Sequence, residues 1–201
     1  MKSPEAIIKW CEMMLKLHPN IEDANYFRAI IKLCKETQTQ ESTMVKIQRN
    51  TAGDSRVQSE VPTREAFDNA NISHIKDVNN LAEVFCSMLK ASASKHDWTK
   101  VEEPYATMFY DDMCATIRGE RDFFDGEWSK LHYYEKERHH LKRSCPDDVT
   151  LIDVIEMVCD CVSAGLARSG NVYDLDIDES ILKKALNNTV DLLKAQCEVI
   201  N

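Results

Sequence analysis

The chain contains 201 residues, of which 43% are hydrophobic and 29% are charged, and its formal net charge is −9. This length favours one main domain with a core of ordinary size. Because phosphate neutralisation needs a basic face, the acidic balance argues against a protein that coats long nucleic acids. No uncharged run reaches the roughly 18 residues of a membrane span, and no signal-peptide pattern is recognisable, so we expect a cytoplasmic protein without membrane contact.

The N-terminal residues predict a helical hairpin over 1–37. Ser3-Pro4 is an N-cap followed by proline at the first helical position, which begins a helix to about residue 17. A second amphipathic helix is expected at 22–36. Two short helices bury too little apolar surface to be stable alone, so their apolar stripe should dock on the main domain or on another copy of the chain. A homo-oligomer formed through the hairpin is one of these alternatives.

Residues 38–62 and 63–201 differ in composition. The segment 38–62 is rich in Gln, Thr, Ser, Glu and Arg, which is typical of a polar linker or a surface excursion. Within it, 43–47 and 56–61 form a candidate strand pair. Apolar residues recur at helical spacing in 63–201, and Gly and Pro are scarce, so we predict an all-α fold. Helices are expected at 64–93, 101–118, 124–142, 150–168 and 178–199.

The adjacent pair His96-Asp97 is the strongest candidate for chemistry. An imidazole and a carboxylate at one point suit a divalent Mn, Fe, Co, Ni, Zn or Mg ion. Upstream, His74 lies on the apolar stripe of the 64–93 helix, where a lone histidine is more often a core residue. The His-Asp pair just beyond the end of that helix favours the alternative in which His74 is also a ligand.

Three further histidines follow in the predicted helix 124–142. His132 and His139 are two helical turns apart and so share a face, whereas His140 is rotated by about 100°. One of the adjacent pair is expected to bind metal, and the other would contact the substrate. The alternative for this segment is a basic helix end that interacts favourably with the helix dipole.

The helix expected at 150–168 carries carboxylates in an otherwise apolar segment. Asp153, Glu156 and Asp160 recur at helical spacing on one side of it. Buried carboxylates need a partner, which a metal or a histidine supplies. Either Glu156 or Asp160 would complete the coordination sphere, and the other would orient a ligand histidine.

The order His, His-Asp, His, Asp/Glu on helices resembles the HD superfamily of metal-dependent phosphohydrolases. More narrowly, it resembles an uncharacterised HD-like family of bacteriophages and Gram-positive bacteria, in which case the compartment would be the cytoplasm of a host. The resemblance covers about residues 70 to 170, and the final carboxylate departs from it because it comes within Glu-x-x-x-Asp. The residues concerned are His74-x-x-x-Val78, His96-Asp97-Trp98-Thr99-Lys100, Trp128-x-x-x-His132, His139-His140 and Ile155-Glu156-Met157-Val158-Cys159-Asp160.

The resemblance implies an HD-like helical bundle with a mono- or dinuclear metal site. We expect hydrolysis of a phosphate ester in a small ligand, with a nucleotide or cyclic nucleotide as the substrate. The expected metal ligands are His74, His96, Asp97, His139 and Asp160; the expected catalytic residues are Asp97, Glu156 and His140; and the expected substrate-binding residues are Lys100, His132, Arg138 and Arg143.

Two other functions are compatible with the same residues. The first is a non-catalytic helical binding protein that keeps a structural metal and sequesters a small ligand or acts on a host factor. The second is a purely structural helical protein, in which the histidines would be scattered. An open metal position with cations nearby would favour the hydrolase.

Overall fold

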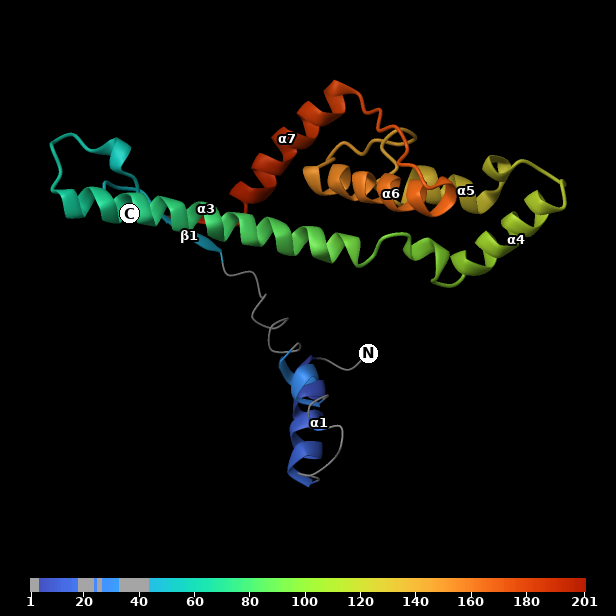
Figure 1. Cartoon of the computed structure of the whole chain (residues 1–201), viewed down its shortest axis with the longest axis horizontal. Coiled ribbons are helices and arrows are strands. Elements are labelled where there is room, and N and C mark those ends of the chain that lie inside the picture. Colours follow the sequence, from blue (N-terminus) through green and yellow to red (C-terminus); the bar gives the residue numbers. More distant parts are fainter. Residues whose placement is uncertain (1–3, 18–23, 25–26, 33–43) are drawn as a thin grey trace. The chain divides into compact units, whose positions relative to one another are not determined.

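The structure is a computed structural model that describes residues 4–17, 24, 27–32 and 44–201. The chain divides into two units, Met1–Met44 and Val45–Asn201 (Figure 1). Residues 45–62 of the segment expected as a linker or surface excursion therefore belong to the larger unit. The described residues are mostly helical, which confirms the predicted all-α class.

The smaller unit contains helix α1, Pro4–Leu17, and a second helical segment described at residues 24 and 27–32. Cys11 is fully buried in this unit, and the rings of Trp10 and Phe27 meet edge to face with centroids 5.6 Å apart. These contacts place the two helical segments against each other. The turn predicted between them lies outside the described residues.

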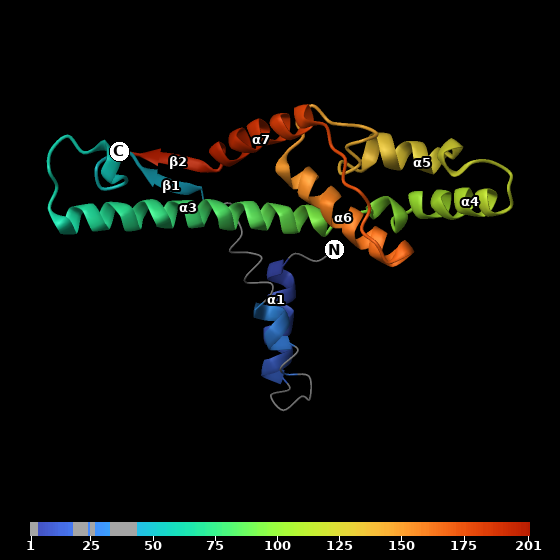
Figure 2. The same cartoon turned by 45° about the horizontal axis from the view of Figure 1, so that its top comes forward.

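The larger unit is built along α3, Arg64–Ala93, as Figure 2 makes clear. Its predicted bounds, 64–93, are confirmed. Thr63 caps the first turn, because its side chain accepts a hydrogen bond from the backbone N–H of Ala66. Beyond α3 come the 3₁₀ turn η2, Trp98–Lys100, helix α4, Tyr105–Ile117, and the 3₁₀ turn η3, Phe123–Asp125.

The predicted helix 124–142 is wrong in its second half. Helix α5 covers Glu127–Leu131 and continues as the π-helix η4, His132–Lys136, after which the backbone of Glu137 is extended. Turns and loop follow up to Thr150. Tertiary contacts of Glu137 and of the histidines beside it hold this loop, and they outweigh the local helical pattern.

Two long helices complete the unit. Helix α6, Leu151–Ser169, begins at a capping box made by Thr150 and Asp153 and ends at Gly170, whose φ of 74° is left-handed. Helix α7, Glu179–Lys194, begins at the N-cap Asp178. No helix among the described residues has the length and apolar character that a membrane crossing requires.

A parallel pair of strands joins distant parts of the unit. Strand β1, Val45–Gln48, pairs with β2, Cys197–Ile200, in a register that begins at Val45 opposite Cys197. The predicted pairing of 43–47 with 56–61 is therefore wrong, as is the helical end of 178–199. Asp54 instead caps a 3₁₀ turn, η1, at Ser55–Val57, which leaves β1 free for the C-terminal strand.

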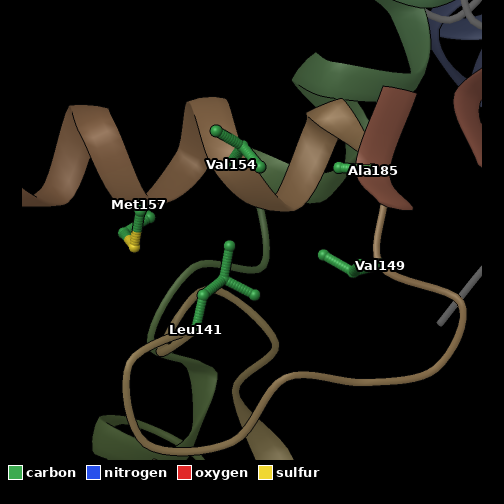
Figure 3. Packing of buried hydrophobic residues seen from close by; sticks show 5 residues of the cluster. All are labelled: Leu141, Val149, Val154, Met157 and Ala185. Atoms are coloured by element: carbon green, nitrogen blue, oxygen red, sulfur yellow. The ribbon is translucent and has the colours of Figure 1, made fainter. Parts of the chain in front are cut away.

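A compact apolar cluster lies beside the loop that precedes α6. Figure 3 shows its members coming from this loop, from α6 and from α7. They are Leu141, Val149, Val154, Met157 and Ala185. Their burial fixes the loop against α6, and so it fixes the histidines that directly precede Leu141.

Candidate metal centre

The backbone turns sharply at the His-Asp pair that follows α3. Asp97 has a φ of 54°, in the left-handed region that non-glycine residues seldom occupy. The carbonyl of Asp97 then accepts a hydrogen bond from the N–H of Lys100. This turn directs the side chains of His96 and Asp97 to the same place. Strained backbone of this kind persists where surrounding contacts hold it, and it concentrates at functional sites.

Four imidazoles surround the Asp97 carboxylate. Its Oδ1 lies 3.4 Å from Nε2 of His132 and 3.7 Å from Nε2 of His139, and its Oδ2 lies 3.3 Å from Nε2 of His96. Nε2 of His140 is 2.8 Å from Nε2 of His132. The ligand atoms form two groups, each within 4.8 Å, and Asp97 belongs to both. These groups are His96, Asp97 and His139, and Asp97, His132 and His140.

Glu156 on α6 orients two of the imidazoles from behind. Its Oε1 lies 3.0 Å from Nδ1 of His96 and 3.3 Å from Nδ1 of His139, and its Oε2 accepts a hydrogen bond from the hydroxyl of Ser92. His139 Nδ1 makes no hydrogen bond, so its approach to Glu156 is an electrostatic contact. A carboxylate at Nδ1 favours the proton there and leaves Nε2 to accept a cation.

The close His139 imidazole is the largest cause that lowers the pKa of Glu156, to about 2. Burial opposes this effect, and the contacts with Ser92 and His96 add to it. Glu156 is therefore an ionised acceptor near neutral pH, with its oxygens directed at the backs of the histidines. Its position behind the two imidazoles fits the orienting role that the sequence left open between Glu156 and Asp160.

Thr99 and Glu137 orient His132 in a similar way. The hydroxyl of Thr99 donates to Glu137 Oε1 over 3.0 Å and lies 2.7 Å from Nδ1 of His132. A hydroxyl has one proton to donate, so Thr99 accepts from His132 Nδ1–H. Nε2 of His132 then presents its lone pair toward Asp97. Trp128 fixes the ring further, because it stacks on His132 with centroids 4.2 Å apart and donates Nε1–H to the Thr99 carbonyl.

The imidazoles of His132 and His140 are neutral near pH 7. Burial is the largest cause that lowers the pKa of His132 to about 4, and burial together with the neighbouring His139 and His132 lowers the pKa of His140 to about 3. Burial by itself would raise the pKa of Asp97. The ammonium group of Lys100, followed by the imidazoles of His96 and His132, outweighs this effect, so the pKa is lowered overall. Neutral imidazole and ionised carboxylate are the forms that bind metal ions.

Several buried polar atoms in the cluster have no hydrogen-bond partner. They are Oδ1 of Asp97 and both ring nitrogens of His139. Leaving such atoms unpaired costs free energy, so natural proteins nearly always satisfy them. A divalent cation beside Asp97 would satisfy Oδ1 and Nε2 together. The residues present therefore fit a metal ion with mixed nitrogen and oxygen ligands, and buried groups of this site could hold one.

Most of the predicted site residues meet here, although they come from four segments. His139 and His140 reach the cluster from the loop after η4 and not from a helix face shared with His132. Asp160 stands at the edge, with Oδ1 3.6 Å from Nε2 of His96. Lys100 also enters the cluster, where its ammonium group contacts Oδ2 of Asp97.

His74 does not belong to this cluster, and the prediction that it converges with His96 and Asp97 is wrong. It lies about 28 Å along α3 from the C-terminal end of the helix, at a rise of about 1.5 Å per residue. Its side chain is 48% exposed, and Nδ1 lies 3.8 Å from Oδ2 of Asp54. The straight helix separates two histidines that the sequence order suggested were partners.

The predicted phosphate-binding arginines are placed differently from each other. Arg138 is held by carboxylates: it donates to Asp153 over 2.7 and 3.0 Å and to Asp148 over 3.0 Å. It therefore anchors the loop to the start of α6, and its donors are not free for a substrate. Arg143 has no carboxylate partner among the described residues and lies over the ring of Phe124 at 4.4 Å.

Sequence reasoning missed the residues that orient the histidines. Ser92 is the penultimate residue of α3, Thr99 follows the His-Asp pair, and Glu137 precedes the second histidine group. Each is a common surface residue type, and only its neighbours in space give it a role. The only sequence signal for this orienting role was that each of these residues lies close in the chain to a histidine or to Asp97.

The fold and the cluster define a mostly helical protein with a buried histidine and aspartate site that could hold a metal ion. Residues 63–198 match the family of unknown function DUF5662, so the chain belongs to that family. No curated protein and no solved structure matches the chain.

Proposed function

We propose that this protein is an HD-type metal-dependent phosphohydrolase that acts on a small phosphate ester such as a nucleotide. The observation that carries the proposal is the convergence of four Nε2 atoms on the carboxylate of Asp97, next to Lys100. With the Asp97 carboxylate, this centre has five donor groups, one more than a four-coordinate structural ion requires. Two ligand groups that share Asp97 favour two ions over one.

The residues have separate tasks in the proposed reaction. When bound, a divalent metal ion would act as a Lewis acid and lower the pKa of water. His96 and His139 would hold one ion and His132 and His140 the other, with Asp97 shared between them. Glu156 keeps His96 and His139 in the ligand orientation, and Thr99 does so for His132.

Asp160 is suited to proton transfer at the edge of the cluster. It is partly exposed, and among the described residues its carboxylate makes no hydrogen bond and only the 3.6 Å contact with His96. Its oxygens can therefore accept a proton from an attacking water. Lys100 would neutralise negative charge that develops on the substrate, since its ammonium group already lies beside Asp97.

The test compares two histidines of the same chain. Metal content and hydrolysis of a panel of nucleotides are measured for the parent protein, for His139→Ala and for His74→Ala. We expect metal and activity in the parent and in His74→Ala, because His74 lies far from the cluster on α3. His139→Ala should lose both. A parent protein that binds metal but hydrolyses no phosphate ester would refute the proposal.

One observation favours the second candidate, a binding protein with a structural metal. His132 and His139 are almost completely buried, with exposed fractions of 0 and 1%, and structural metal sites are closed to water. In that case a chelator would unfold the larger unit. For the hydrolase, removal of the ion should abolish turnover and leave the helix content, measured by circular dichroism, nearly intact.

A further inference from the structure

Exposed apolar side chains lie along one side of α3. Ile72 and Ile75 are 62 and 58% exposed, and Cys86 is exposed as well. A different side of the helix packs within the larger unit, because Ala70 is fully buried and Asn79 lies about 180° from it around the helix axis. Figure 2 shows the strand pair and α7 on one side of α3. The exposed apolar side is therefore available to a partner.

This side of α3 has the heptad spacing of a coiled coil. Its positions recur at alternating intervals of three and four residues over about 26 Å of the helix. They form the α3 stripe, which consists of Ile72, Ile75, Asn79, Ala82, Cys86 and Leu89. No charged residue occupies the stripe or the positions along one of its edges, 71, 78 and 85. A stripe of this period stays in contact with a second helix along its whole length, so the expected partner is a helix.

Charges beside the α3 stripe indicate that the second helix is another copy of α3. Lys76 and Glu83 flank the stripe on its other edge, and neither has an ion-pair partner among the described residues. Two α3 helices can lie antiparallel with Asn79 of one copy opposite the small side chain of Ala82 of the other. In this register Lys76 of each copy lies opposite Glu83 of the other, and such flanking pairs determine partner and orientation.

The uncharged edge of the α3 stripe favours the same arrangement. Val78 is 51% exposed, and Phe85 is half-buried. In the antiparallel register Val78 of one copy lies opposite Phe85 of the other, so two apolar side chains meet. A parallel pair would instead place Val78 beside Glu83 and Phe85 beside Lys90, which leaves apolar side chains next to charges. Both edges of the stripe are therefore complementary in the antiparallel direction.

We propose that two copies of this chain associate through the α3 stripe as an antiparallel helix pair with two-fold symmetry. Each contact occurs twice in such a pair, so the charged edge contributes two ion pairs between Lys76 and Glu83. This inference does not depend on the proposed function, because the candidate metal ligands of the described residues all lie outside α3.

The first experiment measures sedimentation of the full chain over a series of concentrations. One helix pair is a small interface, so the dimer should dissociate on dilution. Ile75→Glu places a charge within the apolar stripe and should weaken the dimer by at least about tenfold. Val190→Glu is the matched control, because Val190 is 65% exposed on α7, and it should leave the dimer unchanged. Circular dichroism checks that both variants keep the helix content of the parent.

Reversal of the charges tests the register. Lys76→Glu and Glu83→Lys each place like charges opposite one another at two symmetric positions. Each should weaken the dimer by about tenfold, because two attractive pairs become repulsive. The double variant with both substitutions should recover the parent affinity to within about threefold. Single variants with the parent affinity would overturn the register, because a parallel pair does not bring these two residues together.

Cys86 reports the direction of the two helices. In the antiparallel register it faces Ile75 of the second copy, while the two Cys86 residues are about 16 Å apart along the axis, too far for a disulfide. Ile75→Cys should therefore join the copies through Cys86 on mild oxidation with diamide, and Cys86→Ser in the same chain should prevent it. Peptide mapping identifies the bond. A disulfide between the two Cys86 residues of the parent would overturn the antiparallel arrangement.

The remaining outcomes separate this inference from the other proposals. A parent chain that is monomeric at every concentration overturns it, even if the protein binds metal and hydrolyses phosphate esters. A dimer that Ile75→Glu leaves intact, as expected if the N-terminal hairpin joined the copies, also overturns it. A dimer that depends on Ile75, Lys76 and Glu83 supports the inference, whether or not the protein turns over any ester.

Discussion

Asp97 combines a left-handed backbone with contacts to one ammonium group and three imidazoles. The backbone conformation costs of order 1 to 3 kcal/mol for a residue other than glycine. Its contacts, above all the ion pair with Lys100, offset this cost in the protein without metal. Lys100 would thus compete with a bound metal ion for the same carboxylate.

Lys100→Met should therefore raise the affinity for a divalent metal ion. The substitution removes a charge-assisted hydrogen bond of about 1.5 to 3 kcal/mol that the ion would have to replace, so a gain of about tenfold is expected. Metal titration by calorimetry measures it. Lys95→Met, at an exposed lysine just before the same turn, is the matched control. An unchanged affinity in Lys100→Met would contradict the competition.

The metal-free protein should lose stability between about pH 6.5 and pH 4. In the unfolded chain the imidazoles of His132 and His140 take up protons near pH 6.5, whereas the folded pKa values are about 4 and about 3. Within this window the unfolded state binds more protons, so the free energy of unfolding falls as the pH falls. Urea unfolding at a series of pH values measures the slope.

His140→Gln should reduce that slope, because one of the two groups no longer titrates. Glu156 acts in a lower window. The pKa of Glu156 is about 2, so its ionised carboxylate stabilises the fold above pH 4.5. This contribution is lost as the pH falls from 4.5 to about 2. A slope above pH 5 that stays the same in His140→Gln would mean that His140 is not buried in its neutral form.

At the scale of elements, the loop between η4 and α6 positions two of the four imidazoles. Arg138 lies between Glu137 and His139 and joins this loop to the capping box of α6, through Asp153. Asp153 is 3% exposed, so its carboxylate depends on this partner.

Arg138→Met should lower the free energy of unfolding by about 2 kcal/mol. The expected loss is smaller than that for a fully buried pair, because the Arg138 side chain is 46% exposed. Arg118→Met removes a surface pair with Glu120 and should cost clearly less than Arg138→Met, because water and salt screen a pair that is fully exposed. Equal losses in the two variants would show that Arg138 does not anchor the loop.

The same loop marks the limit of what the sequence reveals. The bounds of α3 follow from a capping threonine and an apolar period, both of which are local. The histidine-rich segment 132–140 has helical spacing as well, but its fold depends on Thr99 and Glu156 from other elements. Grouping His96 with Asp97 and His139 was predictable from their order. Excluding His74 required the length and straightness of α3.

On the scale of the whole molecule, the two units should be separable. We expect a chain of residues 45–201 to fold with the helix content of the larger unit and to bind as much metal as the full chain, because every ligand lies within it. Circular dichroism and metal analysis measure these properties. Analytical ultracentrifugation of both chains tests whether the hairpin forms an oligomer, which would appear as a change in the number of subunits.

A shorter chain of residues 63–201 provides the contrast. It begins at the boundary that composition alone suggested, and it lacks β1 and η1. Without β1, strand β2 has no partner among the described residues, and the apolar side of α3 next to the strands is uncovered. This chain should unfold at a lower temperature than 45–201. Equal stability would mean that the strand pair does not contribute to the fold.

The pairing of β1 with β2 also affects how fast the unit can form. Helices fold from contacts within a few residues, but Val45 must find Cys197 across almost the entire unit. Closing so long a loop lowers the entropy of the chain before any strand contact stabilises the closed form. Non-local contacts of this kind slow folding. The helices can therefore assemble first, with the candidate metal ligands beyond α3 in place, while the two strands join last. Metal binding during refolding would then precede the closure of the sheet.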